Sequence, residues 1–229
     1  MDGFETRAIV KVTDEGIIRG IDHVASESPL SIVVESDKHG RHELGITMRT
    51  AGHDRLLSLG FIYSEGIISS TEEIEDIVVG DDLVEISLND RSLFDPSQHC
   101  RTTTVTSSCG ICGRLELPNG ITEFNEVLDE GMQIRLAAIS ECLNSVIEKQ
   151  NVFSITGGSH ACASFTNDGS IDRVFEDVGR HNAFDKLVGS YLDEGKKPKP
   201  GLAVFVSGRA SFELVQKSIR AGFPIMIAV

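Results

Sequence analysis

The sequence lacks several features that would place it in a large class of proteins. Lysine and arginine together number 21 against 35 aspartates and glutamates, so the formal net charge is −14. A protein that neutralises the phosphates of a nucleic acid needs a basic face, and we therefore expect no nucleic-acid binding. Six prolines and the absence of a long polar tract argue against disorder. An apolar content of 40% is sufficient for a folded core.

Membrane and secretion signals are also missing from the sequence. No apolar run approaches the roughly 20 residues that a membrane-spanning helix requires. Residues 1–6 have neither the basic nor the apolar region of a signal peptide. The five cysteines, an odd number, fit a reducing compartment better than a framework of disulfides. We therefore expect a cytoplasmic protein without membrane association.

Two regions of different character follow one another along the 229 residues. Segments in which apolar and polar residues alternate predominate in residues 1–125, which predicts a β-rich N-terminal domain. Residues 126–229 alternate between helices and apolar strands, which predicts an α/β domain whose sheet is covered on both faces. The polar residues 90–103 are expected to form an irregular connector.

The expected elements can be placed by their patterns of apolar residues. In the first region we expect one helix and five strands, over residues 54–66 (helix) and 7–12, 31–35, 44–48, 75–79 and 83–88 (strands). In the second region we expect helices over 134–150, 179–192 and 211–221, and strands over 153–155, 161–166, 171–175, 202–206 and 224–229.

The most informative motif is a Cys-x-x-Cys formed by Cys109 and Cys112 and flanked by glycines. Two thiols at this spacing can hold half of a metal site, act as a redox pair or transfer sulfur. A structural zinc site needs two more ligands, and the other cysteines, Cys100, Cys142 and Cys162, are isolated in the sequence. A thioredoxin-type redox pair lacks its usual βαβ context here.

Three polar clusters in the second region combine glycines with side chains that can hold an anion. Each lies beside an expected strand or helix start, where a glycine permits close approach and free N–H groups favour negative charge. Taken singly, each cluster is also compatible with a tight turn or a solvated helix cap. The candidate ligand-binding residues are Gly157, Gly158, His160, Gly179, Arg180, His181, Asn182, Ser207, Gly208 and Arg209.

Together these motifs resemble the FdhD/NarQ family, the formate dehydrogenase accessory sulfurtransferases. The resemblance runs through most of the chain. It is carried by residues 27–30, 47–54, 60–68, Ser-Cys-Gly-Ile-Cys-Gly (108–113), Thr-Gly-Gly-Ser-His-Ala (156–161), Glu-Asp-Val-Gly-Arg-His-Asn-Ala (176–183) and Ser-Gly-Arg (207–209).

The resemblance implies a sulfur relay. A cysteine desulfurase would load sulfur as a persulfide onto Cys109, with Cys112 as partner or relay. The persulfide would then sulfurate a bis(molybdopterin guanine dinucleotide) cofactor of molybdenum or tungsten, bound as substrate, before its insertion into the formate dehydrogenase catalytic subunit. Arg180, His181 and Arg209 would hold the phosphates of the guanine nucleotide moiety.

The resemblance also implies a cytidine-deaminase-like, three-layer α/β fold for residues 126–229. Residues 180–182 would then take the place of the deaminase histidine motif, and residues 207–209 the place of its zinc cysteines. No Pro-Cys-x-x-Cys is present, so we expect no structural metal. Members of the family continue into a further cofactor-contacting segment, so a truncated C-terminus is expected for a chain that ends at Val229.

Two other functions stay open at this point. One is a non-catalytic chaperone that binds the molybdenum cofactor and presents it to formate dehydrogenase. The other is a zinc-dependent deaminase relative. Whichever function applies, a symmetric homodimer is the default assembly.

Overall fold

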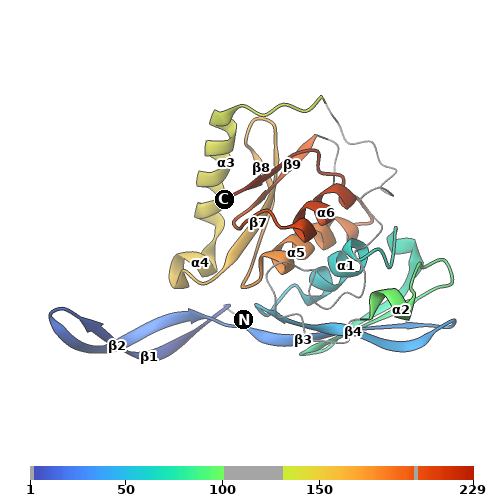
Figure 1. Ribbon diagram of the computed structural model, residues 1–229, viewed down its shortest axis with the longest axis horizontal. Helices are drawn as coiled ribbons and strands as arrows, with labels where there is room; N and C mark the ends of the chain where they lie inside the picture. The colour runs from blue at the N-terminus through green and yellow to red at the C-terminus, as the bar shows by residue number, and fades with distance from the viewer. Residues whose placement is uncertain (1–2, 101–130, 199–200) are drawn as a thin grey trace.

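The computed structural model describes residues 3–100, 131–198 and 201–229. These residues form a two-stranded ribbon, two four-stranded sheets and the helices around them (Figure 1). The first part contains β1 (Phe4–Thr13), β2 (Gly16–Ala25), β3 (Ser28–Ser36), β4 (Gly40–Arg49), α1 (Asp54–Ser64), the 3-10 turn η1 (Thr71–Glu73), β5 (Ile74–Val79), β6 (Leu83–Leu88) and α2 (Pro96–His99). The second contains α3 (Leu136–Lys149), α4 (Asn151–Thr156), β7 (His160–Thr166), β8 (Ile171–Asp177), α5 (Arg180–Leu192), β9 (Leu202–Val206), α6 (Phe212–Arg220) and β10 (Met226–Ala228).

Both larger sheets are mixed. The first has the strand order β4-β3-β6-β5, in which β3 and β6 are parallel and the other pairs antiparallel. The second has the order β10-β9-β7-β8, with β9 and β10 parallel. Mixed sheets combined with helices make this an α+β fold, which confirms the predicted fold class of strands combined with helices.

The helices separate and cover the two sheets. In Figure 1, α3 lies against one face of the β7–β10 sheet, while α5 and α6 lie on the other. Helix α1 lies between α5 and the first sheet. Gly60 of α1 lies so close to the α5 backbone that a Cβ atom there would be 1.9 Å from the Asp185 carbonyl oxygen. The site described below is built where these layers meet.

One hydrophobic core joins residues of both predicted domains. Leu30 and Leu57 from the first region share a buried cluster with Phe184 and Val204 from the second. A smaller cluster around Cys142 lies beneath α3. The predicted boundary at 125/126 falls outside the described residues.

The expected strand over 153–155 is wrong, because this segment is the short helix α4. The Glu176 carboxylate accepts hydrogen bonds from the Val152 and Phe153 backbone N–H groups, at 3.0 and 2.9 Å. It therefore satisfies the free N–H groups with which every helix begins. Gly157 ends the helix with a φ of 65°.

The expected irregular connector over 90–103 contains a second short helix, α2. Its cap is Asp95, whose carboxylate accepts from the Ser97 N–H at 2.9 Å, and Pro96 occupies the first turn. Both are standard signals of a helix start. Among the described residues no helix is both long and apolar enough to cross a membrane.

Candidate functional site

The three polar clusters of the second region come together at one edge of the β7–β10 sheet. His160, at the start of β7, pairs with Asp177 at the end of β8. The next residues of β7 pair with the end of β9, where Cys162 lies opposite Val206. Antiparallel pairing therefore places the start of β7 beside the ends of its two neighbours, which carry the other two clusters.

His160 and Ser207 connect the first and third clusters directly. The His160 Nδ1 atom lies 3.2 Å from both the carbonyl oxygen and the hydroxyl of Ser207. The same hydroxyl accepts a hydrogen bond from the Ala161 N–H at 2.8 Å. The loop after β9 is thus tied to the start of β7.

Arg180 brings the middle cluster to the same place. A Cβ atom added at Gly208 would lie 2.8 Å from Arg180 Cδ and 3.5 Å from His160 Cε1. The arginine side chain therefore crosses the space that only a glycine leaves open. The neighbouring His181 lies with its Nε2 atom 3.1 Å from the Ser211 hydroxyl, at the start of α6.

Asp177 fixes the turn that leads into α5. Its buried carboxylate accepts hydrogen bonds from the N–H groups of Thr50 and Gly179, at 3.2 and 2.8 Å, and forms an ion pair with Lys186 at 2.7 Å. Burial raises the pKa of Asp177, although Lys186 and the hydrogen bonds oppose the shift. Lys186 also donates to the Thr50 carbonyl and is 1% exposed, so its charge belongs to the scaffold and does not face a ligand.

Asn182 is likewise used inside the fold. Its amide nitrogen donates to the Met48 carbonyl at 2.7 Å and to Asp177 at 3.0 Å, while its oxygen accepts from the Thr47 hydroxyl at 3.1 Å. A Cβ at Gly179 would crowd that amide at 3.0 Å. Asn182 therefore holds the start of α5 against β4.

The remaining predicted residues are exposed or lie outside the described chain. Gly157 and Gly158 are exposed at the end of α4, where a Cβ at Gly158 would lie 3.1 Å from Ala25 Cβ. Arg209 is exposed beyond β9. Cys109 and Cys112 lie outside the described residues.

A pocket of about 180 Å³ adjoins His181. Apolar side chains of β3, β4 and α1 form its walls, and its polar lining includes His181, Asp185, Glu213 and Lys217. Lys217 Nζ lies 2.5 Å from Asp185 and 3.6 Å from Glu213, and Glu213 lies 3.7 Å from His181. The sequence interpretation missed this row of charges, although Glu213 and Lys217 have the i,i+4 spacing that places them on one side of α6.

Burial dominates the ionisation of Asp185, which is 1% exposed. Loss of water raises the pKa of this carboxyl from 3.8 to about 6, against the opposing effect of Lys217. Burial lowers the pKa of Lys217, but Asp185 and Glu213 outweigh it and the net shift is upward.

This shift predicts a pH-dependent stability. The folded chain holds the Asp185 proton more tightly than the unfolded chain, so the stabilisation is complete below pH 3.8 and is lost as the pH rises to about 6. Relative to Asp185→Asn, the free energy of unfolding of the wild type should fall by up to about 1.4 kcal/mol per pH unit across this window. Urea unfolding of both proteins across the window measures it, and a difference that does not vary with pH would contradict the assignment.

No group of three or more histidine, cysteine, aspartate or glutamate side chains able to hold a metal ion occurs in the described part of the chain. His181, which would take the place of the deaminase histidine motif, instead contacts Ser211 and lies near Glu213.

Comparison with known proteins gives a consistent result. The sequence profile of the FdhD/NarQ family matches residues 25–229. The sulfur carrier protein FdhD of Saccharolobus solfataricus is 40% identical over 222 residues, which cover 96% of this chain and 82% of the relative. The protein of the same name from Streptomyces avermitilis is 36% identical over 239 residues, covering 98% and 82%.

A solved structure extends the comparison to the fold. It is described as a formate dehydrogenase accessory protein from Desulfotalea psychrophila and superposes with a TM-score of 0.74 at 24% identity, covering 98% of this chain and 83% of that chain. At this identity the likeness concerns the fold alone. The sequence profile and the relatives show that the chain belongs to the FdhD/NarQ family.

Proposed function

We propose that this chain is a sulfur carrier that accepts sulfur from a cysteine desulfurase as a persulfide on Cys109 and delivers it to a bound bis(molybdopterin guanine dinucleotide) cofactor of molybdenum or tungsten for formate dehydrogenase. The relatives named sulfur carrier protein FdhD support the carrier role. The raised pKa values of Cys100, Cys142 and Cys162 support the choice of Cys109 as the sulfur-carrying thiol.

The three described cysteines are poor nucleophiles, and this observation carries the proposal. Burial raises the pKa of Cys142 to about 11 and that of the fully buried Cys162 well above 9.0. Burial, together with the charge of Asp95, also raises the pKa of Cys100. Because the thiolate is the reactive form, these three stay protonated at neutral pH. Sulfur chemistry is thereby left to Cys109 and Cys112.

The transfer needs two exchanges at sulfur. The Cys109 thiolate attacks the outer sulfur of the donor persulfide, the donor S–S bond breaks, and the desulfurase cysteine leaves as a thiolate. The Cys112 thiolate then attacks the inner sulfur of the Cys109 persulfide and releases hydrosulfide to the bound cofactor. The resulting Cys109–Cys112 disulfide returns to the dithiol through a thiol reductant.

The converged clusters supply the binding surface for the cofactor in this proposal. Arg180 and His181 offer cationic or hydrogen-bonding groups of the kind that hold phosphates, and Gly208 lets Arg180 approach the backbone. Arg209, which directly follows Gly208 in the chain, is exposed and adds a further cation. This arrangement fits the guanine nucleotide phosphates of the cofactor.

A cellular assay separates sulfur transfer from cofactor chaperoning. In cells whose own copy of the gene is deleted, the double variant Cys109→Ala, Cys112→Ala is expected to give no formate dehydrogenase activity above the deletion background. Cys142→Ala serves as the matched control and should support activity. Full activity from the double variant would favour the non-catalytic chaperone instead.

Substitution at Gly208 tests the binding surface. A methyl group in Gly208→Ala would meet Arg180 Cδ at 2.8 Å, and the flexible arginine would have to turn away. Calorimetric titration with guanosine diphosphate should show binding weakened about tenfold or more, because a charge-assisted contact to phosphate is lost. An affinity unchanged in both Gly208→Ala and Arg180→Ala would remove these residues from nucleotide binding.

A further inference from the structure

Helix α6 turns charged side chains into the fold and large apolar side chains toward solvent. Its buried residues are Glu213, Leu214, Lys217 and Ser218. Phe212 and Val215, by contrast, are 37% and 39% exposed. A surface helix normally buries its apolar side chains and exposes its charged ones. The placement of charge and of two large apolar side chains on α6 is therefore the reverse of the usual one.

The exposed apolar residues lie in one row along α6. Phe212, Val215 and Ile219 occupy positions i, i+3 and i+7, the spacing that places residues on one side of a helix. Ile219 is half-buried. We call these three residues the apolar stripe of α6. The pocket beside His181 accounts for the inward-facing charges of the helix, whereas the stripe faces away from them. Large apolar side chains gathered on an exposed face are typical of a contact site.

The charge around the stripe differs in sign from that of the whole chain. Residues 207–221 contain three basic side chains and one acidic side chain, so three minus one gives +2, against −14 for all 229 residues. Glu213 and Lys217 are buried and cancel each other. The remaining two are Arg209, which is exposed, and Arg220, which is half-buried. The stripe thus fits a protein surface that combines apolar side chains with carboxylates.

The stripe begins at the edge of the candidate site. The Ser211 hydroxyl, in the residue just before Phe212, lies 3.1 Å from the His181 Nε2 atom. Ser207, four residues earlier, lies with its hydroxyl 3.2 Å from the His160 Nδ1 atom. A protein docked on the stripe would therefore stand next to the surface proposed to hold the sulfur acceptor.

We infer that the apolar stripe of α6 is the docking site of the protein that donates the persulfide. The inference rests on the proposed function, in which a donor must approach, pass on one sulfur and leave again. A short stripe suits such a transient partner, because transient encounters bury small interfaces. A donor with an acidic rim is repelled by most of this chain and attracted at α6, which selects the docking face.

Kinetics of sulfur loading with two donors test the inference. One donor is the cysteine desulfurase of the same organism, supplied with cysteine. The other is glutathione persulfide, which passes its outer sulfur to Cys109 and leaves as glutathione thiolate without docking of a protein. The variant Phe212→Asp, Val215→Asp should raise the KM for the desulfurase at least about tenfold, because a few apolar residues carry most of the affinity of an interface. Its kcat, its loading from glutathione persulfide and its circular dichroism spectrum should match the wild type.

Gln216 tests the sign of the partner's charge, because it is half-buried beside the stripe. Gln216→Glu should raise the KM for the desulfurase and Gln216→Lys should lower it, each by about two- to threefold at low ionic strength. A general loss of folding would move both variants in the same direction. Equal shifts in one direction would overturn the acidic partner.

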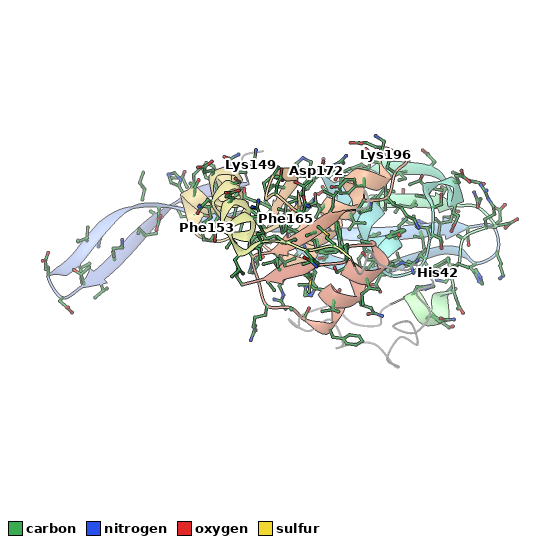
Figure 2. All side chains as sticks on the ribbon, turned by 90° about the horizontal axis from the view of Figure 1, so that it is seen from above. His42, Lys149, Phe153, Phe165, Asp172 and Lys196 are labelled. Atoms are coloured by element: carbon green, nitrogen blue, oxygen red, sulfur yellow. The ribbon has the colours of Figure 1, made fainter. Side chains whose placement is uncertain are left out.

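The matched control places two carboxylates on another exposed apolar site. Leu136 and Ile147 of α3 are 82% and 59% exposed. Figures 1 and 2 show α3, whose last residue Lys149 is labelled in Figure 2, apart from α6. Leu136→Asp, Ile147→Asp should therefore leave the KM for the desulfurase as it is in the wild type.

Calorimetric titration of the desulfurase into the chain, without cysteine, separates this inference from the proposed function, since it requires no sulfur transfer. A wild type that does not bind, or a stripe variant that binds as tightly as the wild type, would overturn the docking site. Equal weakening by the α3 variant would overturn it as well. If the wild type binds and the stripe variant does not, but neither donor loads sulfur, the proposed function fails and the docking site is still supported.

Discussion

Adding one methyl group at Gly189 is expected to destroy the packing of α1 on α5. A Cβ atom there would lie 1.8 Å from the Leu56 carbonyl oxygen and 3.0 Å from the Gly60 backbone nitrogen. These are backbone atoms, so no side chain can turn aside and the helices must separate. Overpacked cores commonly lose 1–3 kcal/mol through side-chain shifts, and we expect Gly189→Ala to cost at least about 3 kcal/mol.

The sign of the effect makes this test sharp. Alanine is the better helix former by about 1 kcal/mol, so without the clash the substitution would stabilise the protein. Urea unfolding followed by circular dichroism measures the change. Gly20→Ala, where a Cβ meets nothing within 4 Å, is the control and should stay within about 0.5 kcal/mol. Equal or greater stability of Gly189→Ala would refute the close crossing of the two helices.

Replacing Lys186 by methionine is expected to destabilise the chain by about 3–5 kcal/mol, because it leaves the buried Asp177 carboxylate without its ion-pair partner. Asp177 also holds Thr50 and Gly179 through their N–H groups, so the start of α5 should loosen with it. Chemical denaturation measures the free energy, and amide hydrogen exchange at the first turn of α5 measures the loosening.

Lys196 provides the matched comparison. It forms an ion pair with Glu194 at 3.1 Å, but both side chains are exposed. Exposed pairs contribute about 0–1 kcal/mol, so Lys196→Met should change stability little. If the two lysine variants lost the same free energy, the proposed role of the Asp177–Lys186 pair would be wrong.

Local patterns were sufficient to predict most of the helices and strands. Alternation located β3, β4 and β6, and the periodicity of apolar residues located α3 and α5. Helix α4 was not predicted, because the residue that caps its start is Glu176, 23 to 24 positions further along the chain. The sequence analysis also failed to predict the strand β2. The turn just before Gly16 is the feature that could have indicated it, and Gly16 itself has a φ of 129°.

The candidate site was predicted in part for a similar reason. Clusters at the ends of neighbouring strands could be expected to meet, and His160, Arg180 and Ser207 do so. Which side chains of a cluster point inward depends on packing between distant elements. Asn182 and Lys186 therefore serve the scaffold, through contacts to Met48 and Thr50 that no local pattern encodes.

Mass spectrometry of the intact chain after incubation with a cysteine desulfurase and cysteine tests sulfur carriage most directly. The proposed chemistry predicts one added sulfur mass on the wild type and no addition on Cys109→Ala. The Cys142→Ala variant should gain the same mass as the wild type, because the thiol that it removes is buried. A wild type that gains no sulfur, or a Cys109→Ala variant that gains as much as the wild type, would contradict it.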